Sequence, residues 1–593
     1  MILNILHRPD EPSRRHLFEL EQDYAHANNI RTTILMTAAA LADPQQVELA
    51  KREAAEHGDE IGLSFHGLTH PTITAITGYG QEALWLFSLE HKRAIIDFLA
   101  RRFAEALGAP PTSVAAYHLD SSTMAIVREL IPSVRVAVAG CFEEGVRVFH
   151  GCNHSWYLFN EGMPWGPWYP SKTHTLRPAR DEDDWCGIVA VPHLMRDMVL
   201  SYEGRNDYWA SHPPNVMRGM GYEGEECPYD RNLIDMFRWQ ERFNDGYSYY
   251  NSFVSTAWLA EHHAIDDRPE VAQSLYRQQL DYLGSLMTEG KVEAMTLTGF
   301  ADWFRTNREF GRPEVYFAKE LLYGSGKHYV WYLDADQRIL IDTTQGGSIG
   351  DLRPYAGRVE VETGPERPEL AFGSYPYLIQ SQHRTGMQNH FQDGARSTAL
   401  LCADGESVDL ATVPTRVAAL RREPGGSGGA EPDAGERIVV ELEPVTVRIA
   451  GADVRVRTTT SFRRGGVTAI RRSIDVPRRL AGSIVLTERV KLAPGITEYP
   501  QPMHGVSAAV RGSRDESLDY AYNGRTIEQD AATSAEATVP SVSTRVRLVP
   551  GDGASWTGTV EEGHLFSPFV TIALSRALGA EEETEVWLEV DKS

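Results

Sequence analysis

The chain has 593 residues, of which 58 are Lys or Arg and 82 are Asp or Glu, so its formal net charge at pH 7 is −24. This acidic balance argues against nucleic acid and anionic membrane surfaces as main partners, because both are bound by basic patches. A hydrophobic content of 42% and a charged content of 24% are ordinary for a folded protein, so we expect a large core and a neutral or cationic ligand.

Five cysteines stand at irregular spacing, which predicts buried thiols rather than a disulfide scaffold. The first residues read as a strand and lack the basic segment, apolar run and small-residue cleavage site of a signal peptide. No run of about 18 apolar residues occurs, which is the length that a membrane-spanning helix needs. We therefore expect a cytoplasmic protein without a membrane partner, or one whose leader is missing from this sequence.

Strand and helix patterns alternate from the start to about residue 312. The predicted strands cover residues 2–6, 30–36, 60–64, 114–117, 134–139, 187–191, 253–258 and 291–296. The predicted helices cover residues 14–28, 44–57, 82–107, 121–130, 269–287 and 298–305. This alternation predicts parallel strands joined by helical crossovers. The number of strands indicates an α/β barrel of about seven or eight strands, which would form a first domain of residues 1–312.

Alternating strands dominate from residue 313 onward. The predicted ones cover residues 329–333, 339–342, 438–442, 445–449, 454–460, 467–474, 483–492 and 586–590. Arg and Val alternate at 454–457, the period-2 pattern of a sheet with one face in water. We expect residues 313–593 to form an all-β domain, a large β-sandwich. The Gly-, Pro- and acid-rich stretch 423–436 fits a hairpin tip and a boundary within this region equally well.

Two histidines at spacing four follow the third predicted strand. At the mouth of a barrel, His66 and His70 can turn toward one point, and neutral imidazole is a ligand for Zn, Fe, Co or Ni. The ordinary alternative is a pair of polar loop histidines.

Two carboxylates, Asp10 and Glu11, follow the first predicted strand. One of them can bind a cation while the other accepts a proton from water. The competing interpretation is the start of a helix, because acidic residues near Pro12 favour a helix N-terminus.

Together, the two clusters resemble the polysaccharide deacetylase family, the chitooligosaccharide deacetylase homology domain. Residues 58–71 (GDEIGLSFHGLTHP) are similar to that family's glycine–x–glutamate–isoleucine–glycine strand and HxxxHP metal motif. Asp10 and Glu11 stand where the family carries an Asp-Asp pair, and residues 279–303 resemble its closing helix, strand and helix. The resemblance covers residues 1–310 and implies a distorted (β/α) barrel of about seven strands.

The resemblance also implies a catalytic metal, with Zn as the first choice and Ni, Co or Fe as alternatives. Its ligands would be Glu11, His66 and His70. Asp10 would be the base that activates a metal-bound water for attack on an acetyl carbonyl. A histidine would then protonate the leaving amine or alcohol. The candidates for this acid, which follow predicted strands, are His193, His262 and His263.

The sequence departs from the family pattern in two places. Glu11 stands in place of the usual Asp and is one methylene longer, which can displace the metal. The family's Arg-x-x-Pro-Tyr segment is absent, and residues 116–122 (AYHLDSS) stand there instead. His118 and Asp120 in this segment are candidate substrate-binding or catalytic groups, although His118 fits a strand-end cap equally well.

The segment 149–174 is dense in aromatic residues and histidines and has little regular pattern. Aromatic rings in a loop that lines a cleft stack against the CH faces of sugars. A packed long loop explains the composition equally well. The candidate sugar-binding residues are Trp156, Trp165, Trp168 and Tyr169.

Three functions follow from these features, and all take a carbohydrate as the ligand. The first is a metal-dependent carbohydrate deacetylase, favoured by the two clusters. The second is a glycoside hydrolase, favoured by the large β region, which would use two carboxylates about 5–9 Å apart. The third is a non-catalytic sugar-binding protein, favoured by the missing Arg-x-x-Pro-Tyr segment. The carboxylates available to a glycosidase are Asp10, Asp120, Glu161, Asp197 and Glu261.

The net charge also bears on the substrate. A strongly acidic enzyme does not by itself attract uronate or sulfated glycans, so a neutral or amino sugar is favoured. Arg8 and Arg196 are the residues that can reverse the field in the cleft. The sequence identifies neither the sugar, the linkage nor the oligomeric state.

Overall fold

The computed structural model describes residues 1–81, 83–84, 87–140, 162–203, 213–218, 229–260, 268–355, 375–381, 395–424, 436–496, 499–500 and 503–593. The chain divides into two compact units. The first contains Met1–Arg312 and Ala318–Ser325, and the second contains Pro313–Phe317 and most of the residues after Ser325.

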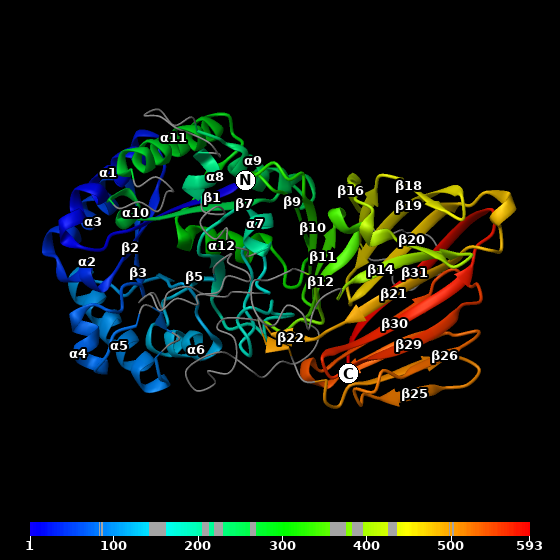
Figure 1. Ribbon diagram of the computed structural model, residues 1–593. Helices are drawn as coiled ribbons and strands as arrows, with labels where there is room; N and C mark the ends of the chain where they lie inside the picture. Colours follow the sequence, from blue (N-terminus) through cyan, green and yellow to red (C-terminus); the bar gives the residue numbers. More distant parts are fainter. Residues whose placement is uncertain are drawn as a thin grey trace. The chain divides into compact units, whose positions relative to one another are not determined.

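The first unit is built on a parallel sheet that curls into a nearly closed barrel (Figure 1). Its strands are β1 (Ile2–Arg8), β2 (Thr32–Met36), β3 (Glu60–Ser64), β4 (Ser113–Ala115), β5 (Val136–Gly140), β6 (Val189–Pro192) and β7 (Tyr249–Ser255). They lie in the order β6-β5-β4-β3-β2-β1-β7, and the short β8 (Glu293–Ala294) pairs with β1. Asn251 on β7 donates its side-chain N–H to the Pro192 carbonyl on β6 over 2.5 Å, which links the two edge strands.

Helices connect these strands, as the alternation predicted. They are α1 (Arg15–Ala27), α2 (Ala38–Ala42), α3 (Pro44–His57), α4 (Pro71–Thr77), α5 (Leu89–Leu107), α6 (Ser121–Leu130), α7 (Met198–Glu203), α8 (Pro213–Arg218), α9 (Asn232–Trp239), α10 (Thr256–Ala260), α11 (Pro269–Thr288) and α12 (Leu297–Asn307). None of the helices in the described residues is long and apolar enough to cross a membrane.

Local chemistry sets the ends of these helices. Asp43 accepts a hydrogen bond from the backbone N–H of Gln45 at the start of α3, and Gly58 ends the helix with a φ of 75°, where glycine is favoured. The predicted start of the helix at residue 82 is wrong, since α5 begins at Leu89. Ser88 caps the helix there by accepting from the His91 N–H. The predicted strand 253–258 is wrong at its end, since β7 stops at Ser255 and α10 begins at Thr256.

The second unit consists of antiparallel sheets. A five-stranded sheet has the order β13 (Ile379–Gln380), β12 (Ser348–Pro354), β11 (Gln337–Asp342), β10 (His328–Leu333) and β9 (Glu314–Lys319). A six-stranded sheet has the order β15 (Glu406–Asp409), β14 (Ser397–Ala403), β21 (Val485–Leu492), β30 (Ser567–Ala577), β29 (Thr557–His564) and β26 (Thr526–Gln529). A two-stranded ribbon pairs β22 (Gly495–Ile496) with β23 (Tyr499–Pro500).

The largest sheet has ten strands. Their order is β16 (Val417–Glu423), β17 (Arg437–Leu442), β19 (Ala452–Arg463), β20 (Val467–Asp475), β31 (Glu581–Lys592), β28 (Thr544–Pro550), β27 (Ser534–Val539), β24 (Ser507–Arg511) and β25 (Glu516–Asp519), with β18 (Val445–Ile449) paired to β19. Strands β16 and β17, which flank residues 425–435, pair directly with each other.

The six- and ten-stranded sheets form a sandwich with a largely apolar interior. On β19 the valines at 454 and 456 are buried while the arginines at 455 and 457 are exposed, as the alternation predicted. Arg472 of the ten-stranded sheet and Glu488 of the six-stranded sheet form a buried ion pair between the layers, with Nη2 and Oε2 3.1 Å apart. The fold is therefore an α/β barrel plus a β-sandwich region.

Candidate functional site at the barrel mouth

The carboxyl ends of the barrel strands bring five side chains together. His66 and Tyr117 follow β3 and β4, His193 follows β6, Arg8 is the last residue of β1, and Phe253 lies on β7. Rings from four of these segments touch: the His66 ring centroid lies 4.4 Å from that of Tyr117, and the His193 ring centroid lies 4.4 Å from that of Phe253. Active sites of (β/α) barrels lie at this end of the strands.

His66 and His193 face each other at the centre of this mouth. Their Nε2 atoms are 3.1 Å apart, and the residues are only 1% and 6% exposed. Nδ1 of His66 lies 2.8 Å from the Ser64 hydroxyl, which fixes the orientation of that ring. Two neutral imidazoles at this distance share one N–H, so the pair holds a donor and an acceptor side by side.

The surroundings keep this pair uncharged. Burial is the main reason that the pKa values of His66 and His193 lie well below the ordinary histidine value, and the positive charge of Arg8 lowers both further. Arg196 adds to the effect on His193. Arg8 and Arg196, the two residues that the sequence named as able to reverse the field in the cleft, thus both act on this pair.

Asp10 lies at the edge of the mouth and is held by three groups. Its Oδ1 accepts hydrogen bonds from the Thr256 hydroxyl and from the Glu11 backbone N–H, and its Oδ2 lies 3.4 Å from Arg14 Nη1. Asp10 is partly exposed, so its carboxylate is reachable from solvent. The Glu11 side chain is exposed, and its nearest hydrogen-bond donor is the Ser13 hydroxyl at 3.5 Å.

The metal that the resemblance implies needs three converging donor atoms. His70 uses Nδ1 to cap α4, where it accepts from the backbone N–H of Thr72 and lies 2.8 Å from the Thr72 hydroxyl. Among the described residues, no group of three ligand atoms within 4.8 Å of one another includes Glu11, His66 or His70. The three donors as placed do not fit a metal ion, and the metal stays a prediction from the sequence.

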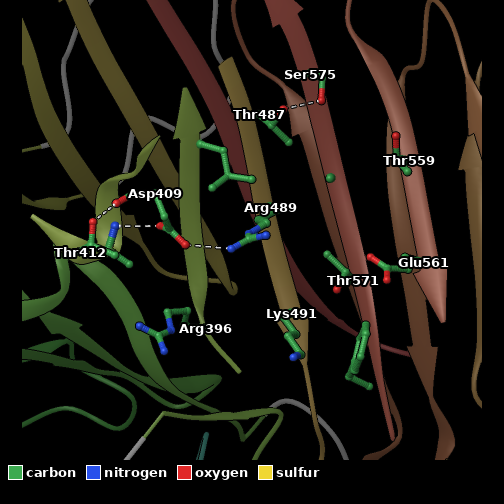
Figure 2. A pocket seen from close by; sticks show the side chains of 14 residues that line it. Arg396, Asp409, Thr412, Thr487, Arg489, Lys491, Thr559, Glu561, Thr571 and Ser575 are labelled. Atoms are coloured by element: carbon green, nitrogen blue, oxygen red, sulfur yellow. Dashed lines mark hydrogen bonds and ion pairs between the residues drawn. The ribbon is translucent and has the colours of Figure 1, made fainter. Parts of the chain in front are cut away.

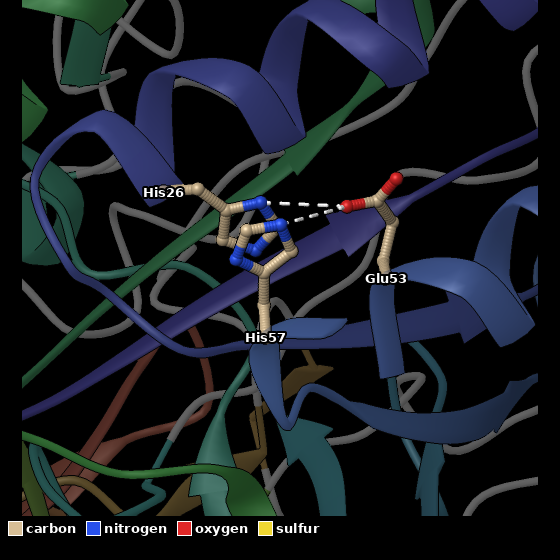
Figure 3. Close-up of side chains that lie close together, drawn as sticks. All are labelled: His26, Glu53 and His57. Atoms are coloured by element: carbon tan, nitrogen blue, oxygen red, sulfur yellow. Dashed lines mark ion pairs between the residues drawn. The ribbon is translucent and has the colours of Figure 1, made fainter. Parts of the chain in front are cut away.

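Within the described part of the chain, a group of three possible ligands, His26, Glu53 and His57, lies between α1 and α3 (Figure 3). Glu53 Oε2 is 3.4 Å from Nδ1 of His26 and 3.8 Å from Nε2 of His57. The two imidazoles are stacked, with ring centroids 3.6 Å apart and an interplanar angle of 11°. Parallel rings cannot both direct in-plane lone pairs at one ion about 2.0–2.1 Å away. His26 also bonds Asp59 at 2.9 Å, so this group is a structural clasp.

Asp120 and His118 lie in the segment that replaces the family's Arg-x-x-Pro-Tyr. Asp120 caps α6 by accepting from the Thr123 N–H and forms an ion pair of 2.7 Å with Lys92, both side chains being 1% exposed. The Lys92 charge lowers the pKa of Asp120 against the opposing effect of burial. His118 is also buried, and burial lowers its pKa to about 4. Both carboxylate oxygens of Asp120 are therefore occupied, Oδ2 by Lys92 and Oδ1 by Ser122 and Thr123.

Asp197 is fully buried as well. It caps α7 by accepting from the N–H groups of Val199 and Leu200, and its other oxygen accepts from the N–H of Leu321. Burial raises its pKa to about 7. Its oxygens are thus bound to backbone groups and face no open space in the mouth.

The described aromatic candidates are packed inside the protein. Trp165, Trp168 and Tyr169 are all buried. The Trp168 indole N–H donates to the Thr175 carbonyl at 2.8 Å, and the Tyr169 hydroxyl donates to the carbonyls of Phe304 and Arg308. Their role in sugar binding stays a prediction. The remaining predicted residues, Trp156, Glu161, Glu261, His262 and His263, lie outside the described residues.

A buried polar network beneath the mouth was not anticipated from the sequence. His7 accepts at Nδ1 from the Gln22 amide at 3.0 Å and donates from Nε2 to the Tyr276 hydroxyl at 2.5 Å. Burial lowers the pKa of His7 to about 3, so this ring is neutral. Glu21 of α1 is fully buried, and neither of its carboxyl oxygens has a hydrogen-bond partner among the residues that the structure describes. Its pKa is raised well above the ordinary value by burial and by Asp10.

The sequence signal for this network was weak. Glu21 and Gln22 sit in an amphipathic helix, where charged and amide residues normally face water. Only their position on the side of α1 that carries Leu17 and Phe18, both buried, marks them as inward-facing.

No protein-family model matches the chain, and no curated protein matches it. Among solved structures, a "putative glycoside hydrolase/deacetylase" from Parabacteroides distasonis is similar at 13% identity over 62% of this chain and 88% of that chain, with a TM-score of 0.44. A 4-alpha-glucanotransferase from Thermococcus litoralis is similar at 11% identity over all of both chains, with a TM-score of 0.28. A putative mutarotase from Salmonella typhimurium is similar at 7% identity over 47% of this chain and 94% of that chain, with a TM-score of 0.27.

Proposed function

We propose that the chain is a carbohydrate-active hydrolase that removes acetyl groups from a poly- or oligosaccharide at the barrel mouth. The observation that carries the proposal is the buried, neutral His66–His193 pair, with Nε2 atoms 3.1 Å apart beside the positive charge of Arg8. The resemblance of residues 58–71 to the deacetylase motif supports the choice of an acetylated sugar as substrate.

The pair supplies the two proton transfers that acyl hydrolysis needs. One imidazole accepts a proton from water as the water oxygen attacks the acetyl carbonyl carbon. The imidazolium that forms gives that proton, directly or through the Nε2–Nε2 contact, to the leaving amine or alcohol as the acyl bond breaks, so acetate is released and both rings return to the neutral state. The Arg8 guanidinium favours the negative charge that forms on the carbonyl oxygen.

The described carboxylates support acyl over glycosidic cleavage. Glycoside hydrolysis needs two carboxyl groups facing one sugar ring. Asp120 is bound to Lys92, and Asp197 is bound to three backbone N–H groups. Of the three described candidates, Asp10 alone is partly exposed at the mouth.

The proposal is tested by incubating the purified chain with acetylated chito- and xylo-oligosaccharides and measuring acetate and new reducing ends in the same samples. Acetate without new reducing ends supports the deacetylase. Reducing ends without acetate support the glycoside hydrolase and contradict the proposal. Binding of the saccharides with neither product supports a non-catalytic protein and also contradicts it.

A further inference from the structure

The six-stranded sheet of the second unit carries a hollow of about 570 Å³ on its outer face (Figure 2). This volume lies within the range of about 300–1,000 Å³ that small-molecule sites occupy. Its lining comes from β14, β21, β29 and β30 and from the turn after β15, all within the second unit. The hollow is therefore separate from the barrel mouth.

Strand alternation places polar side chains on this face. Leu486, Val490 and Leu492 of β21 are buried in the sandwich, whereas the residues between them point outward. The outward residues that line the hollow on β21 and β30 are Thr487, Arg489, Lys491, Phe569, Thr571, Ala573 and Ser575.

Ala573 creates the depth of the hollow. It stands in register between Arg489 on β21 and Thr559 on β29. In the next row, Thr571 stands between Lys491 and Glu561. Short side chains at 571 and 573 thus form a floor between long charged side chains on either side.

The cationic side of the hollow is held in place. Arg489 Nη2 lies 2.8 Å from Asp409 Oδ2, and Asp409 is fixed in turn by the Ala411 N–H. Figure 2 shows Arg396, Arg489 and Lys491 on one side of the hollow. The Lys491 ammonium lies 4.2 Å from the centroid of the Phe569 ring at one end.

The opposite side of the hollow presents polar side chains that have no hydrogen-bond partner among the described residues. The side chains of Thr559, Thr571 and Glu561 make no hydrogen bond to any described residue, and Glu561 is exposed. Figure 2 shows all three facing the hollow across from Arg489. A carboxylate and two hydroxyls opposite a fixed guanidinium match the hydroxyls of a sugar, which both donate and accept.

We propose that this hollow is a second saccharide-binding site, which holds a short segment of a glycan without cleaving it. Glu561 accepts hydrogen bonds from sugar hydroxyls, Arg489 donates to sugar oxygens, and Phe569 offers a ring for the CH face of one sugar. Such a site would retain a long glycan on the protein while the barrel acts on another part of it. The binding claim does not depend on the activity proposed for the barrel.

The test measures binding of chitohexaose, cellohexaose and xylohexaose to the full chain by calorimetry. Glu561→Ala removes the carboxylate that accepts from sugar hydroxyls, and Ala573→Arg fills the hollow with a long side chain. Each is expected to weaken binding of at least one hexasaccharide by about tenfold or more. Glu583→Ala, which removes an exposed glutamate from β31 of the other sheet, is the matched control and leaves binding unchanged.

Turnover of a short acetylated disaccharide, which reports on the barrel alone, stays at the wild-type rate in both hollow variants. The proposal is overturned if the wild-type chain binds none of the three hexasaccharides, or if Glu561→Ala and Ala573→Arg leave their affinity unchanged. A chain that binds a hexasaccharide in the hollow but releases no acetate contradicts only the proposed barrel activity.

Discussion

His66 and His193 place their Nε2 atoms 3.1 Å apart although 127 positions separate them in the chain. They follow β3 and β6, and β4 and β5 lie between those two strands in the sheet. Their side chains therefore meet across the mouth of the barrel and not along its wall. This cross-barrel contact, on which the Arg8 charge acts, is the basis for the activity proposed above.

The pH dependence of turnover is the first prediction. Because burial and Arg8 lower the pKa of both histidines, the neutral pair persists below pH 6.5, and the acid limb of kcat/KM should lie below that value. Arg8→Met removes one of the charges that lower the two histidine pKa values, so the acid limb of kcat/KM should move to higher pH. The matched control is Arg14→Met, which removes a cation that pairs with Asp10 instead. Profiles between about pH 4 and 9 check this, and an acid limb that Arg8→Met leaves in place would contradict it.

The Lys92–Asp120 pair should matter for stability. Both side chains are 1% exposed and 2.7 Å apart, so Lys92→Met leaves an unpaired buried charge and should cost about 3–5 kcal/mol of unfolding free energy. Arg93→Met breaks the exposed pair with Glu129 one position along α5 and should leave the urea midpoint almost unchanged. If Lys92→Met and Arg93→Met lowered the urea midpoint by the same small amount, the buried pair would not be needed for stability. A folded Asp120→Asn chain that loses turnover would instead give Asp120 a catalytic role.

Glu21 should make stability depend on pH. Its folded-state pKa lies well above the ordinary value, so it remains protonated in the folded protein after it has ionised in the unfolded chain. The stability that it contributes is complete at low pH and is lost as pH rises from about 4.5 toward the folded-state pKa. Glu21→Gln cannot ionise, so its advantage over the wild type should grow between about pH 5 and 8. Urea unfolding at both pH values checks this, and a difference that does not change with pH would count against it.

Two roles of His70, the observed helix cap and the predicted metal ligand, can be told apart by substitution. Its Nδ1 caps α4, so His70→Asn should keep stability while His70→Ala loses about 0.5–2 kcal/mol. Both variants should retain turnover if the cap is the only role. Elemental analysis of the same preparations tests the predicted metal site. One equivalent of Zn, Ni, Co or Fe that disappears in His70→Asn together with turnover would support the metal site predicted from the sequence.

Much of the fold was predictable because local chemistry marks its boundaries. The strand 60–64 and the helix 44–57 agree with β3 and α3, where Asp43, Pro44 and Gly58 define the helix ends. Strand β7 was placed too late because it carries Asn251 and Ser252, whose polar side chains are buried. Both donate across the fold, Asn251 to the Pro192 carbonyl and Ser252 to the side-chain oxygen of Gln279.

The candidate site was predictable only in part. His66 stood out because it follows a short, recognisable strand within a specific motif. His193 remained one of three candidate acids, since nothing in the sequence states that the ends of β3 and β6 meet. Asp120 looked catalytic because a carboxylate after a strand is typical of barrel sites, whereas its partner Lys92 lies 28 positions earlier on α5.

The most direct test of the account is acetate release by His66→Gln and His193→Gln measured beside His57→Gln, an imidazole that stacks on His26 in the α1–α3 clasp and is not part of the pair. The account predicts that each of the first two variants loses at least about 100-fold in kcat/KM, and that the double variant loses little more, because the histidines act as one unit. Unfolding midpoints confirm that the variants remain folded, and His57→Gln keeps the wild-type rate. A folded His66→Gln or His193→Gln chain that still releases acetate at the wild-type rate would contradict the assignment of this pair as the reacting centre.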